Sequence, residues 1–448
     1  MAWNSPRDFP RAILHIDGDA FFASCEVAKD PLLRGKPVVT GKERGIASSM
    51  SYEAKRKGVT RGMILSDIRK VCPDAVILPS DYETYSLFSN RMYAIVRRYT
   101  PAVEEYSIDE CFADLTGLRR TLRMPYPAMA EAIKRELETE LGMTFSMGLS
   151  ATKVLAKIGS KWKKPDGLTV IPLSGAKPYL QKTPTIKVWG IGPNTAAYLE
   201  KLGVYTAYEF AMKDEKWVLK NLHKPAYELW KELNGEAVSE VDAVGRESYQ
   251  SISKTKTFTP PSKDPAFVFS QLSKNIENAC IKARRWGLAS PEIFFFLKTQ
   301  DFKYHGCEIR LSHPTNLPQE ILAVVKEHFR EVFEDGLLPR RPQGVGAPVS
   351  SGYRATGIGL LKLQDAGSMQ LDLFGQVLKS EGLKQVFESV DGICARFGKH
   401  TVFLASSFGA VTRSAHLGAR GDLPERTKRL FRGENFRQRL NIPSLGEV

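Results

Sequence analysis

The chain has 448 residues, of which 42% are hydrophobic and 25% are charged, and its formal net charge at pH 7 is +14. This length suggests about three domains, and no apolar run is long enough to span a bilayer. The composition therefore indicates a soluble globular protein and excludes one that spans a membrane.

The excess of positive charge favours a polyanionic partner, nucleic acid first and a membrane surface second, although a solvated basic surface would give the same total. The six cysteines are scattered and form no Cys-x-x-Cys pair, which argues against a zinc site or a disulfide framework. The first residues lack the apolar core of a secretory signal. We therefore expect a cytoplasmic protein.

Strand and helix patterns alternate over the first 175 residues. The apolar run at 12–22 predicts a strand followed by a turn, and 103–115 predicts a β-hairpin. Apolar residues at helical spacing predict a helix at 84–99, and a charged amphipathic helix is predicted at 127–141. The basic segment 50–57 and residues 152–162 are also predicted as helices, with a short strand at 145–149.

The pattern changes in the second half of the chain. Residues 183–233 are predicted as helices with short loops, and 235–250 as a polar linker. Strands and helices alternate again over 251–363, with strands expected at 292–297 and 352–358. A tail follows, whose strongly basic last part is predicted to be mostly disordered. We find no internal repeat.

Three acidic side chains border strand-like segments. Asp17 ends the apolar run from Ala12, and the pair Asp109-Glu110 lies between apolar residues of the predicted hairpin. Carboxylates at a buried strand edge need positive compensation, which two divalent cations would supply, with the Gly18 carbonyl as a further ligand. The alternative is that these aspartates stabilise turns, the role we expect for Asp19.

Adjacent carboxylates on one straight strand would face opposite sides of the sheet. Asp109 and Glu110 can therefore share a metal ion only if the chain bends between them. The aromatic pair that follows Asp17 also has two interpretations. Phe21 is expected in the core, whereas Phe22 could lie under a sugar ring and clash with a 2′-hydroxyl, which would select deoxynucleotides.

Two basic segments could hold phosphates. Tyr52 and Lys55 lie three residues apart and would share one helix face, and Lys164 follows the helix predicted at 152–162. Each segment could equally be a solvated basic face or a lysine-rich helix end. A third segment, Gly190-Ile191-Gly192-Pro193, places a tight turn before a helix, where backbone N–H groups can hold a phosphate without reading a base.

Taken in chain order, these motifs resemble the Y family of translesion DNA polymerases, and within it the bacterial polymerase IV type. The resemblance covers residues 12 to about 363 in one unbroken order. It rests on the segments His15–Glu26, Ser51–Lys55, Tyr106–Glu110, Lys164–Gly167 and Val188–Pro193.

The resemblance implies an α+β multidomain protein with the right-hand architecture. Its parts would be a palm (1–22 and 82–175), small fingers (23–81), a helical thumb with a helix-hairpin-helix (176–241), a linker (242–250), an α/β little finger (251–363) and a partly disordered extension with a clamp-binding motif (364–448).

The family's functional residues fall on motifs already described. Asp17, Asp109 and Glu110 match its catalytic metal carboxylates, with Gly18 as the carbonyl ligand. Phe21, Phe22, Tyr52, Lys55 and Lys164 match its nucleotide contacts, with Phe22 as the sugar gate. The thumb turn at Gly190, Ile191 and Gly192 would contact DNA, as would Arg354.

The implied reaction is template-directed addition of a deoxynucleotide from dNTP to the 3′-hydroxyl of a primer annealed to template DNA. Two Mg²⁺ ions would serve it, and Mn²⁺ can substitute. We expect low-fidelity lesion bypass by a monomer, without proofreading, because too few residues precede Asp17 for an upstream exonuclease domain and no second metal constellation follows.

Some positions depart from the family pattern. Lys55 stands where arginine is frequent, which gives a point charge in place of a bidentate fork. Gly18 replaces a bulkier residue, so a more flexible turn is expected. Cys25 and Cys111 flank the site where valine or alanine is more usual, which suggests sensitivity to oxidation.

A short peptide beyond the predicted little finger, Gln370-Leu371-Asp372-Leu373-Phe374, resembles the motif by which bacterial polymerases bind the sliding clamp; a buried helix start would look similar. Two other functions remain as alternatives. A palm-type nucleotidyl cyclase would share the carboxylates but would need neither the thumb turn nor the clamp peptide. An inactive DNA-binding subunit would lack one of the three carboxylates.

Overall fold

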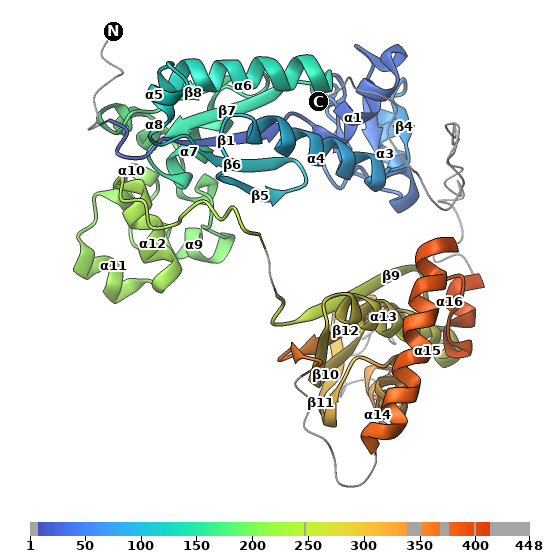
Figure 1. The fold of residues 1–448 in the computed structure, drawn as a ribbon. Helices are drawn as coiled ribbons and strands as arrows, with labels where there is room; N and C mark the ends of the chain where they lie inside the picture. The colour runs from blue at the N-terminus through green and yellow to red at the C-terminus, as the bar shows by residue number, and fades with distance from the viewer. Residues whose placement is uncertain (1–7, 246–247, 338–351, 368–375, 398–399, 413–448) are drawn as a thin grey trace, which may run out of the picture. The chain divides into compact units, whose positions relative to one another are not determined.

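A computed structural model describes residues 8–245, 248–337, 352–367, 376–397 and 400–412 (Figure 1). The described residues divide into two compact units, one over 8–245 and one from 248 onward. None of the helices in these ranges combines the length and the apolar composition that crossing a bilayer requires.

The first unit is built on a five-stranded sheet in the order β5-β6-β1-β7-β8. Its strands are β1 (Ile13–Gly18), β5 (Val103–Ser107), β6 (Glu110–Asp114), β7 (Phe145–Ser150) and β8 (Leu168–Val170). The central strand β1 is antiparallel to both of its neighbours, and β7 is parallel to β8.

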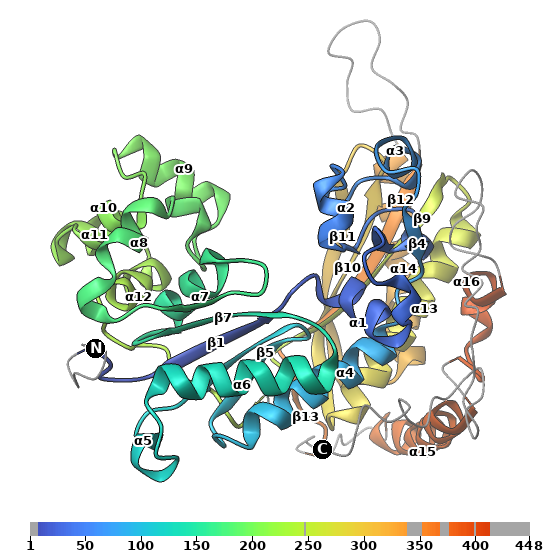
Figure 2. The ribbon, with the colours of Figure 1, turned by 90° about the horizontal axis from the view of Figure 1, so that it is seen from above.

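Helices cover both faces of this sheet. Leu14 and Ile16 of β1 point into the large core shared with α4 (Tyr82–Arg97) and α6 (Tyr126–Leu141), which Figure 2 shows along one side of the sheet. The alternate residue Ile13 packs with Ala156 of α7 (Lys153–Trp162) on the other face. A short helix, α5 (Leu118–Thr121), precedes α6.

A small subdomain lies between β1 and α4 in the sequence. It contains a three-stranded sheet of β3 (Ser49–Met50), β2 (Val38–Thr40) and β4 (Val76–Leu78), with α1 (Phe21–Lys29), α2 (Tyr52–Arg56) and α3 (Leu65–Val71). Its own core includes Val39, Ala54 and Ile68, all completely buried.

The helical block predicted at 183–233 is present, but it begins earlier than predicted, with α8 (Lys177–Lys182). The helices α9 (Pro193–Lys201), α10 (Ala207–Ala211), α11 (Glu215–Asn221) and α12 (Lys224–Leu233) follow, and all five pack around a common core. The buried Glu232 carboxylate accepts hydrogen bonds from the backbone N–H groups of Val154, Val238 and Ser239, so α12 is held against the start of α7.

Part of the predicted linker is attached to the first unit. Val241 packs beside Ile13 and Phe112, and the Asp242 N–H donates to Glu104 Oε2 at 2.8 Å. The same Glu104 carboxylate pairs with Lys153.

The second unit contains β9 (Ile252–Ser262), α13 (Pro265–Arg285), β10 (Leu288–Thr299), β11 (Tyr304–Thr315), α14 (Pro318–Leu337), β12 (Tyr353–Leu361) and β13 (Gln364–Asp365). The sheet order is β11-β10-β12-β9 with antiparallel neighbours, and β13 pairs with β10. Ile293, Phe295 and Leu297 of β10 point into the core that α13 and α14 complete.

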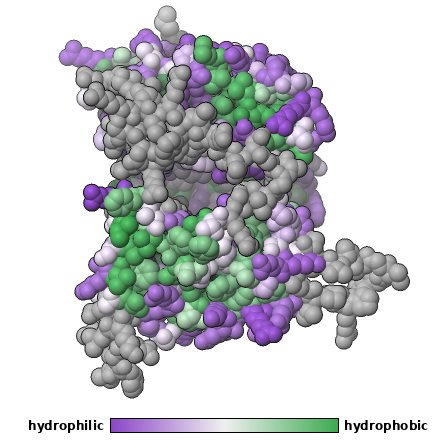
Figure 3. All heavy atoms as spheres, turned by 90° about the vertical axis from the view of Figure 1, so that its right-hand side faces the viewer, coloured by the Kyte–Doolittle hydropathy of each residue, from purple (hydrophilic) through white to green (hydrophobic). Residues whose placement is uncertain are grey.

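The chain beyond β13 folds in part, which the sequence pattern did not reveal. Helices α15 (Gln376–Phe397) and α16 (Phe408–Thr412) flank a 3₁₀ turn at Ala405–Ser407. Arg284 of α13 donates to both Asp391 oxygens, at 2.7 and 2.8 Å, and Glu277 accepts from Ser407 and from the Leu404 N–H. Figure 3 shows polar and apolar side chains intermixed on this part of the surface.

Candidate active site

The three predicted carboxylates meet at one edge of the first sheet. Asp17, near the end of β1, is paired in register with Glu110, the first residue of β6. Asp109 lies in the turn between β5 and β6, and its carbonyl accepts from the Gly18 N–H at 2.8 Å. The bend that the sequence required between Asp109 and Glu110 is therefore present.

Each carboxylate has a hydrogen-bond donor within this structure. Asp17 Oδ1 lies 2.5 Å from Lys164 Nζ, and both Glu110 oxygens lie 2.8 Å from Lys157 Nζ. The Ser107 hydroxyl donates to Asp109 Oδ1 at 2.5 Å. Two lysines thus compensate two of the three charges.

Burial and these partners shift the titration of the site. Burial raises the pKa of Asp17, against the opposing effect of Lys164. Burial alone would also raise the pKa of Glu110, but hydrogen bonds from His15 and Lys157 hold it at about 2. The completely buried His15 has its pKa lowered to about 4, mainly by burial, so its imidazole is neutral at pH 7.

The donor set suits a hard divalent cation. Three carboxylates and a nearby backbone carbonyl supply only oxygen ligands, the type that Mg²⁺ and Mn²⁺ prefer. In the described ranges, however, no three His, Cys, Asp or Glu side chains are placed so that they could hold a metal ion as they stand. The ammonium groups of Lys157 and Lys164 instead provide the positive charge beside Glu110 and Asp17.

Asp19 stabilises the turn, as expected, and joins several segments. Its buried carboxylate accepts from Ser146 Oγ at 2.8 Å, from Thr144 Oγ1 at 3.1 Å and from the Asp166 N–H at 2.7 Å. The Tyr52 hydroxyl also donates to it, at 3.4 Å. One carboxylate therefore connects the β1 turn to β7, to α2 and to the loop that carries Lys164.

The two phenylalanines that follow the turn have different environments. Phe21 is 3% exposed and belongs to the large core, as the sequence predicted, and its place among the nucleotide contacts stays a prediction. Phe22 is half-buried and stacks on Tyr85 with ring centroids 4.6 Å apart and an interplanar angle of 12°. Tyr82 meets it edge-on at 5.4 Å.

The predicted phosphate-binding cations gather beside these carboxylates. Ser51 caps α2, and Lys55 Nζ lies 4.0 Å above the Tyr52 ring. Burial, and then the nearby positive charge of Lys164, lower the pKa of Lys55. Burial and Asp19 raise the pKa of Tyr52, which keeps its hydroxyl protonated as a donor. Neighbouring cations favour an anionic ligand.

The sequence matches a known protein family over both units of the structure. Residues 16–161 match the sequence model of the impB/mucB/samB family, and residues 249–373 match that of its C-terminal domain. DNA polymerase IV of Caulobacter vibrioides is 31% identical over 396 residues, 87% of this chain and 93% of that protein. This chain belongs to the impB/mucB/samB family of Y-family polymerases.

Other relatives agree with the assignment. DNA polymerase IV of Listeria monocytogenes is 31% identical over 332 residues, 73% of this chain and 92% of that protein. A Y-family DNA polymerase chimera of Dbh and Dpo4 superposes with a TM-score of 0.65 at 22% identity, covering 78% of this chain and 98% of that one. The fold is thus the Y-family one, with palm, fingers, thumb and little finger.

The turn that is predicted to contact DNA is a tight turn directly before α9. Gly190 has φ of +90°, and a Cβ there would lie 2.8 Å from Leu229 Cδ1, so glycine is required. Ile191 is buried and anchors the turn, whereas Gly192 is exposed at the N-cap of α9 and Pro193 is in the first turn of that helix. The exposed N–H groups at this helix start are available to a phosphate.

Arg354 lies in the second unit of the polymerase, on β12. Its guanidinium carbon is 4.4 Å from the centroid of the Phe302 ring. The predicted clamp-binding residues 370–374 and the basic segment from 413 lie outside the described residues.

Two of the expected departures from the family pattern are corrected. Cys25 and Cys111 are completely buried, and burial raises the pKa of both thiols, which keeps them protonated and inaccessible to oxidants. Gly18 is not a loose point in the turn, because its N–H binds the Asp109 carbonyl and a Cβ there would lie 2.7 Å from the Phe21 ring.

The pairing of Lys157 with Glu110 was not predicted from the sequence. Lys157 of α7 is 5% exposed and lies 4.5 Å from the Tyr106 ring centroid and 5.3 Å from that of Trp189. The indole Nε1–H of Trp189 donates to the Tyr106 hydroxyl at 2.9 Å. The sequence feature that could have indicated this contact is the position of Lys157 on the face of the predicted helix that points into the core. Trp189 immediately precedes the thumb turn, so the turn and the carboxylates share packing partners.

Proposed function

We propose that this Y-family protein is a DNA-directed DNA polymerase that adds deoxynucleotides from dNTP to a primer 3′-end under the direction of template DNA. The observation that carries the proposal is the meeting of three carboxylates with a cluster of cations from other segments. Asp17, Asp109 and Glu110 offer oxygen ligands, while Lys55 and Lys164 offer positive charge beside them. This combination suits a metal-bound triphosphate.

We propose Mg²⁺ as the ion, with Mn²⁺ able to replace it. Asp17, Asp109 and Glu110 would hold it, with the Gly18 carbonyl as a further donor. When bound, a pair of such ions activates the attacking hydroxyl and stabilises the leaving pyrophosphate in an in-line displacement. Lys164 would then transfer its contact from Asp17 to a phosphate, since it already lies at the ligand edge.

The half-buried Phe22 would select the sugar. Its ring is supported by Tyr85 and Tyr82, and Tyr85 is itself fixed by a 2.7 Å hydrogen bond to the buried Glu26. A ring braced from behind cannot retreat from a 2′-hydroxyl without repacking the core. Exclusion of ribonucleotides would therefore be steric.

The remaining assignments follow the family. The turn at 190–192 and Arg354 would contact the DNA backbone, and residues 370–374 would bind a sliding clamp. We also propose the domain bounds that were inferred from the sequence and a monomeric state. The activity would be low-fidelity lesion bypass without proofreading, and the location cytoplasmic. The free cysteines in the described ranges support that location.

Primer extension with Mg²⁺ tests the function directly. Asp109→Ala and Glu110→Gln should abolish incorporation, whereas Glu105→Gln, an exposed carboxylate on the same hairpin, should extend primers at the wild-type rate. Extension that survives Asp109→Ala would refute the assignment. Formation of a cyclic nucleotide in place of an extended primer would establish the cyclase alternative.

A further inference from the structure

The loop that carries Lys164 is held mainly by polar contacts. It joins α7 to β8, and residues 163–166 are all exposed. Its end is attached to the sheet, because the Gly167 carbonyl accepts from the Met147 N–H at 2.7 Å. From this loop Lys164 Nζ reaches Asp17 Oδ1 at 2.5 Å. The position of the ammonium group therefore depends on the contacts of the residues beside it.

Asp166 connects this loop to two other parts of the first unit. Its backbone N–H donates to Asp19 Oδ2 at 2.7 Å, and its carboxylate accepts a hydrogen bond from Lys134 Nζ. Its φ of +60° lies in the left-handed region, which aspartate tolerates better than most residues. Asp166 follows Lys164 by only two residues, so whatever fixes Asp166 also restricts Lys164.

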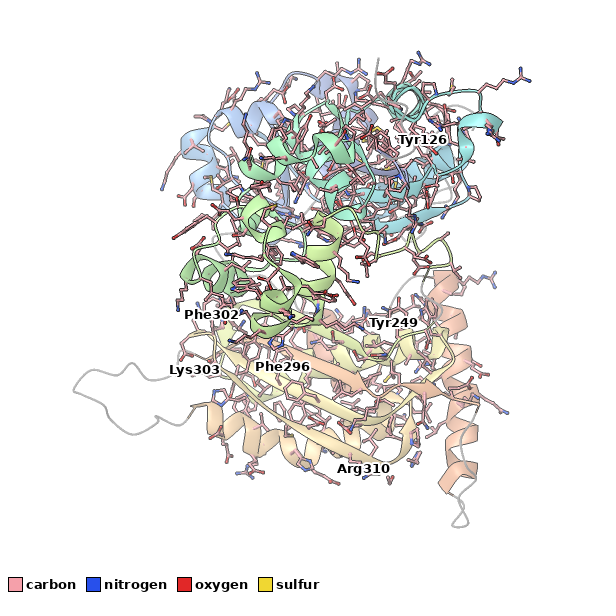
Figure 4. All side chains as sticks on the ribbon, turned by 90° about the vertical axis from the view of Figure 1, so that its left-hand side faces the viewer. Tyr126, Tyr249, Phe296, Phe302, Lys303 and Arg310 are labelled. Carbon is pink, nitrogen blue, oxygen red and sulfur yellow. The ribbon has the colours of Figure 1, made fainter. Side chains whose placement is uncertain are left out.

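Lys134 extends from a firmly anchored helix. The helix α6 begins with Tyr126, labelled in Figure 4, whose ring packs against that of Phe9 with centroids 6.0 Å apart. Further along the helix, Ile133 and Leu137 are completely buried in the large core. Because close packing leaves such a helix little freedom to shift, the Lys134 side chain starts from a fixed point.

A second carboxylate directs the Lys134 side chain toward the loop. Glu138, one turn later on α6, also accepts a hydrogen bond from Lys134 Nζ. Glu138 itself accepts from the N–H of Phe145, the first residue of β7, at 3.3 Å. The hydrogen bond from Lys134 lowers the pKa of Asp166, so that carboxylate is ionised at pH 7. Contacts thus run from β7 through Glu138 and Lys134 to the loop.

We propose that Lys134 is a positioning residue for the triphosphate contact of Lys164. This inference rests on the phosphate-binding role proposed for Lys164 above. The Asp166 side chain is 55% exposed, and exposed ion pairs add little to folding stability. The restraint on a short loop is the larger effect, because a cation held in place before the nucleotide arrives loses less freedom on binding it.

Single-turnover incorporation of one deoxynucleotide on a primed template with Mg²⁺ tests the proposal, because it separates the Kd for dNTP from the rate of chemistry. Lys134→Met should raise this Kd about threefold to fivefold, the effect of one exposed charge pair. The maximal rate should change less than about twofold. Lys134→Arg, which keeps the cation, should bind dNTP within about twofold of wild type. Arg135→Met removes a cation from the next, exposed position of α6 and should leave the Kd unchanged.

Combination with Lys164→Met shows whether Lys134 acts through Lys164. Lys164→Met alone should raise the Kd for dNTP about tenfold or more, since it removes a charge-assisted contact to phosphate. Adding Lys134→Met should then change the Kd less than about 1.5-fold, because the group that it positions is absent. The thermal unfolding midpoint of Lys134→Met should stay within about 3 °C of wild type.

The possible results separate this inference from the function on which it rests. An unchanged Kd in Lys134→Met, an equal loss in Lys134→Arg or Arg135→Met, or a loss of the same size in the Lys164→Met background would each overturn the positioning role. Each of these results would leave the triphosphate contact of Lys164 intact. Wild-type affinity of Lys164→Met for dNTP would instead refute that contact, and the positioning role with it.

Discussion

Lys157 should stabilise the metal-free palm by compensating Glu110, and Lys157→Met tests this. The methionine keeps the length of the side chain but removes the ammonium group 2.8 Å from both carboxylate oxygens. The difference between the ordinary Glu110 pKa of 4.5 and its value of about 2 corresponds to ~3 kcal/mol. His15 shares in this effect and solvent screens part of it, so we expect the unfolding free energy to fall by about 2 kcal/mol at pH 7.

The pH dependence has a definite sign. A carboxyl group whose pKa is lowered on folding stabilises the protein above its unfolded-state pKa, and this contribution is lost as the pH falls through the folded-state value. The difference between Lys157→Met and wild type should thus be complete at pH 7 and should shrink from about pH 4.5 toward pH 2.

Urea unfolding followed by tryptophan fluorescence is the appropriate assay, since most described tryptophans belong to the first unit: Trp162, Trp189, Trp217 and Trp230. Lys182→Met, at the exposed end of α8, is the control and should change the unfolding free energy by less than about 0.5 kcal/mol. Added Mg²⁺ should reduce the Lys157→Met deficit, because a bound cation would compensate Glu110. An unchanged deficit with Mg²⁺ would refute the reasoning.

Further substitutions test other parts of the protein. Phe22→Ala should raise ribonucleotide incorporation relative to deoxynucleotide by about tenfold or more, while Tyr82→Phe, which keeps the supporting ring, should not; unchanged discrimination would exclude the gate. Gly190→Ala, whose Cβ would clash with Leu229, should weaken duplex DNA binding. The control is Gly203→Ala, at a thumb glycine with φ of +71° and open space around it, which should have a smaller effect. Equal effects would show that the turn does not contact DNA. Asp391→Asn should weaken the docking of α15 on α13 by about 1–3 kcal/mol and should speed hydrogen exchange in α15. The control is Glu388→Gln, because Glu388 takes part in no described ion pair.

The sequence could predict features that depend on local order. The apolar run before Asp17 predicted β1, and the two adjacent carboxylates required the bend that separates β5 from β6. Helical spacing predicted α4, α6 and α7 within a few residues. These predictions succeeded because a buried strand and an amphipathic helix each leave a periodic pattern in a single segment.

Contacts between distant segments could not be predicted in the same way. Lys157 and Glu110 are 47 residues apart, and Trp189 and Tyr106 are 83 apart; nothing in either segment alone indicates its partner. The docking of α15 on α13 depends on Arg284 and Asp391, which are 107 residues apart.

Asp19 accounts for the way in which the separate parts of the site reach a common position. The three carboxylates lie at the edge formed by β1 and β6, but the cations proposed to bind the triphosphate come from α2 and from the loop after α7. Each of these two segments is attached to the same buried carboxylate, by the Tyr52 hydroxyl and by the Asp166 N–H. Ser146 and Thr144 fix that carboxylate to β7 and the residue before it. The segments that carry Lys55 and Lys164 are therefore positioned relative to Asp17 by Asp19, whose carboxylate oxygens are already occupied by hydrogen bonds within the protein.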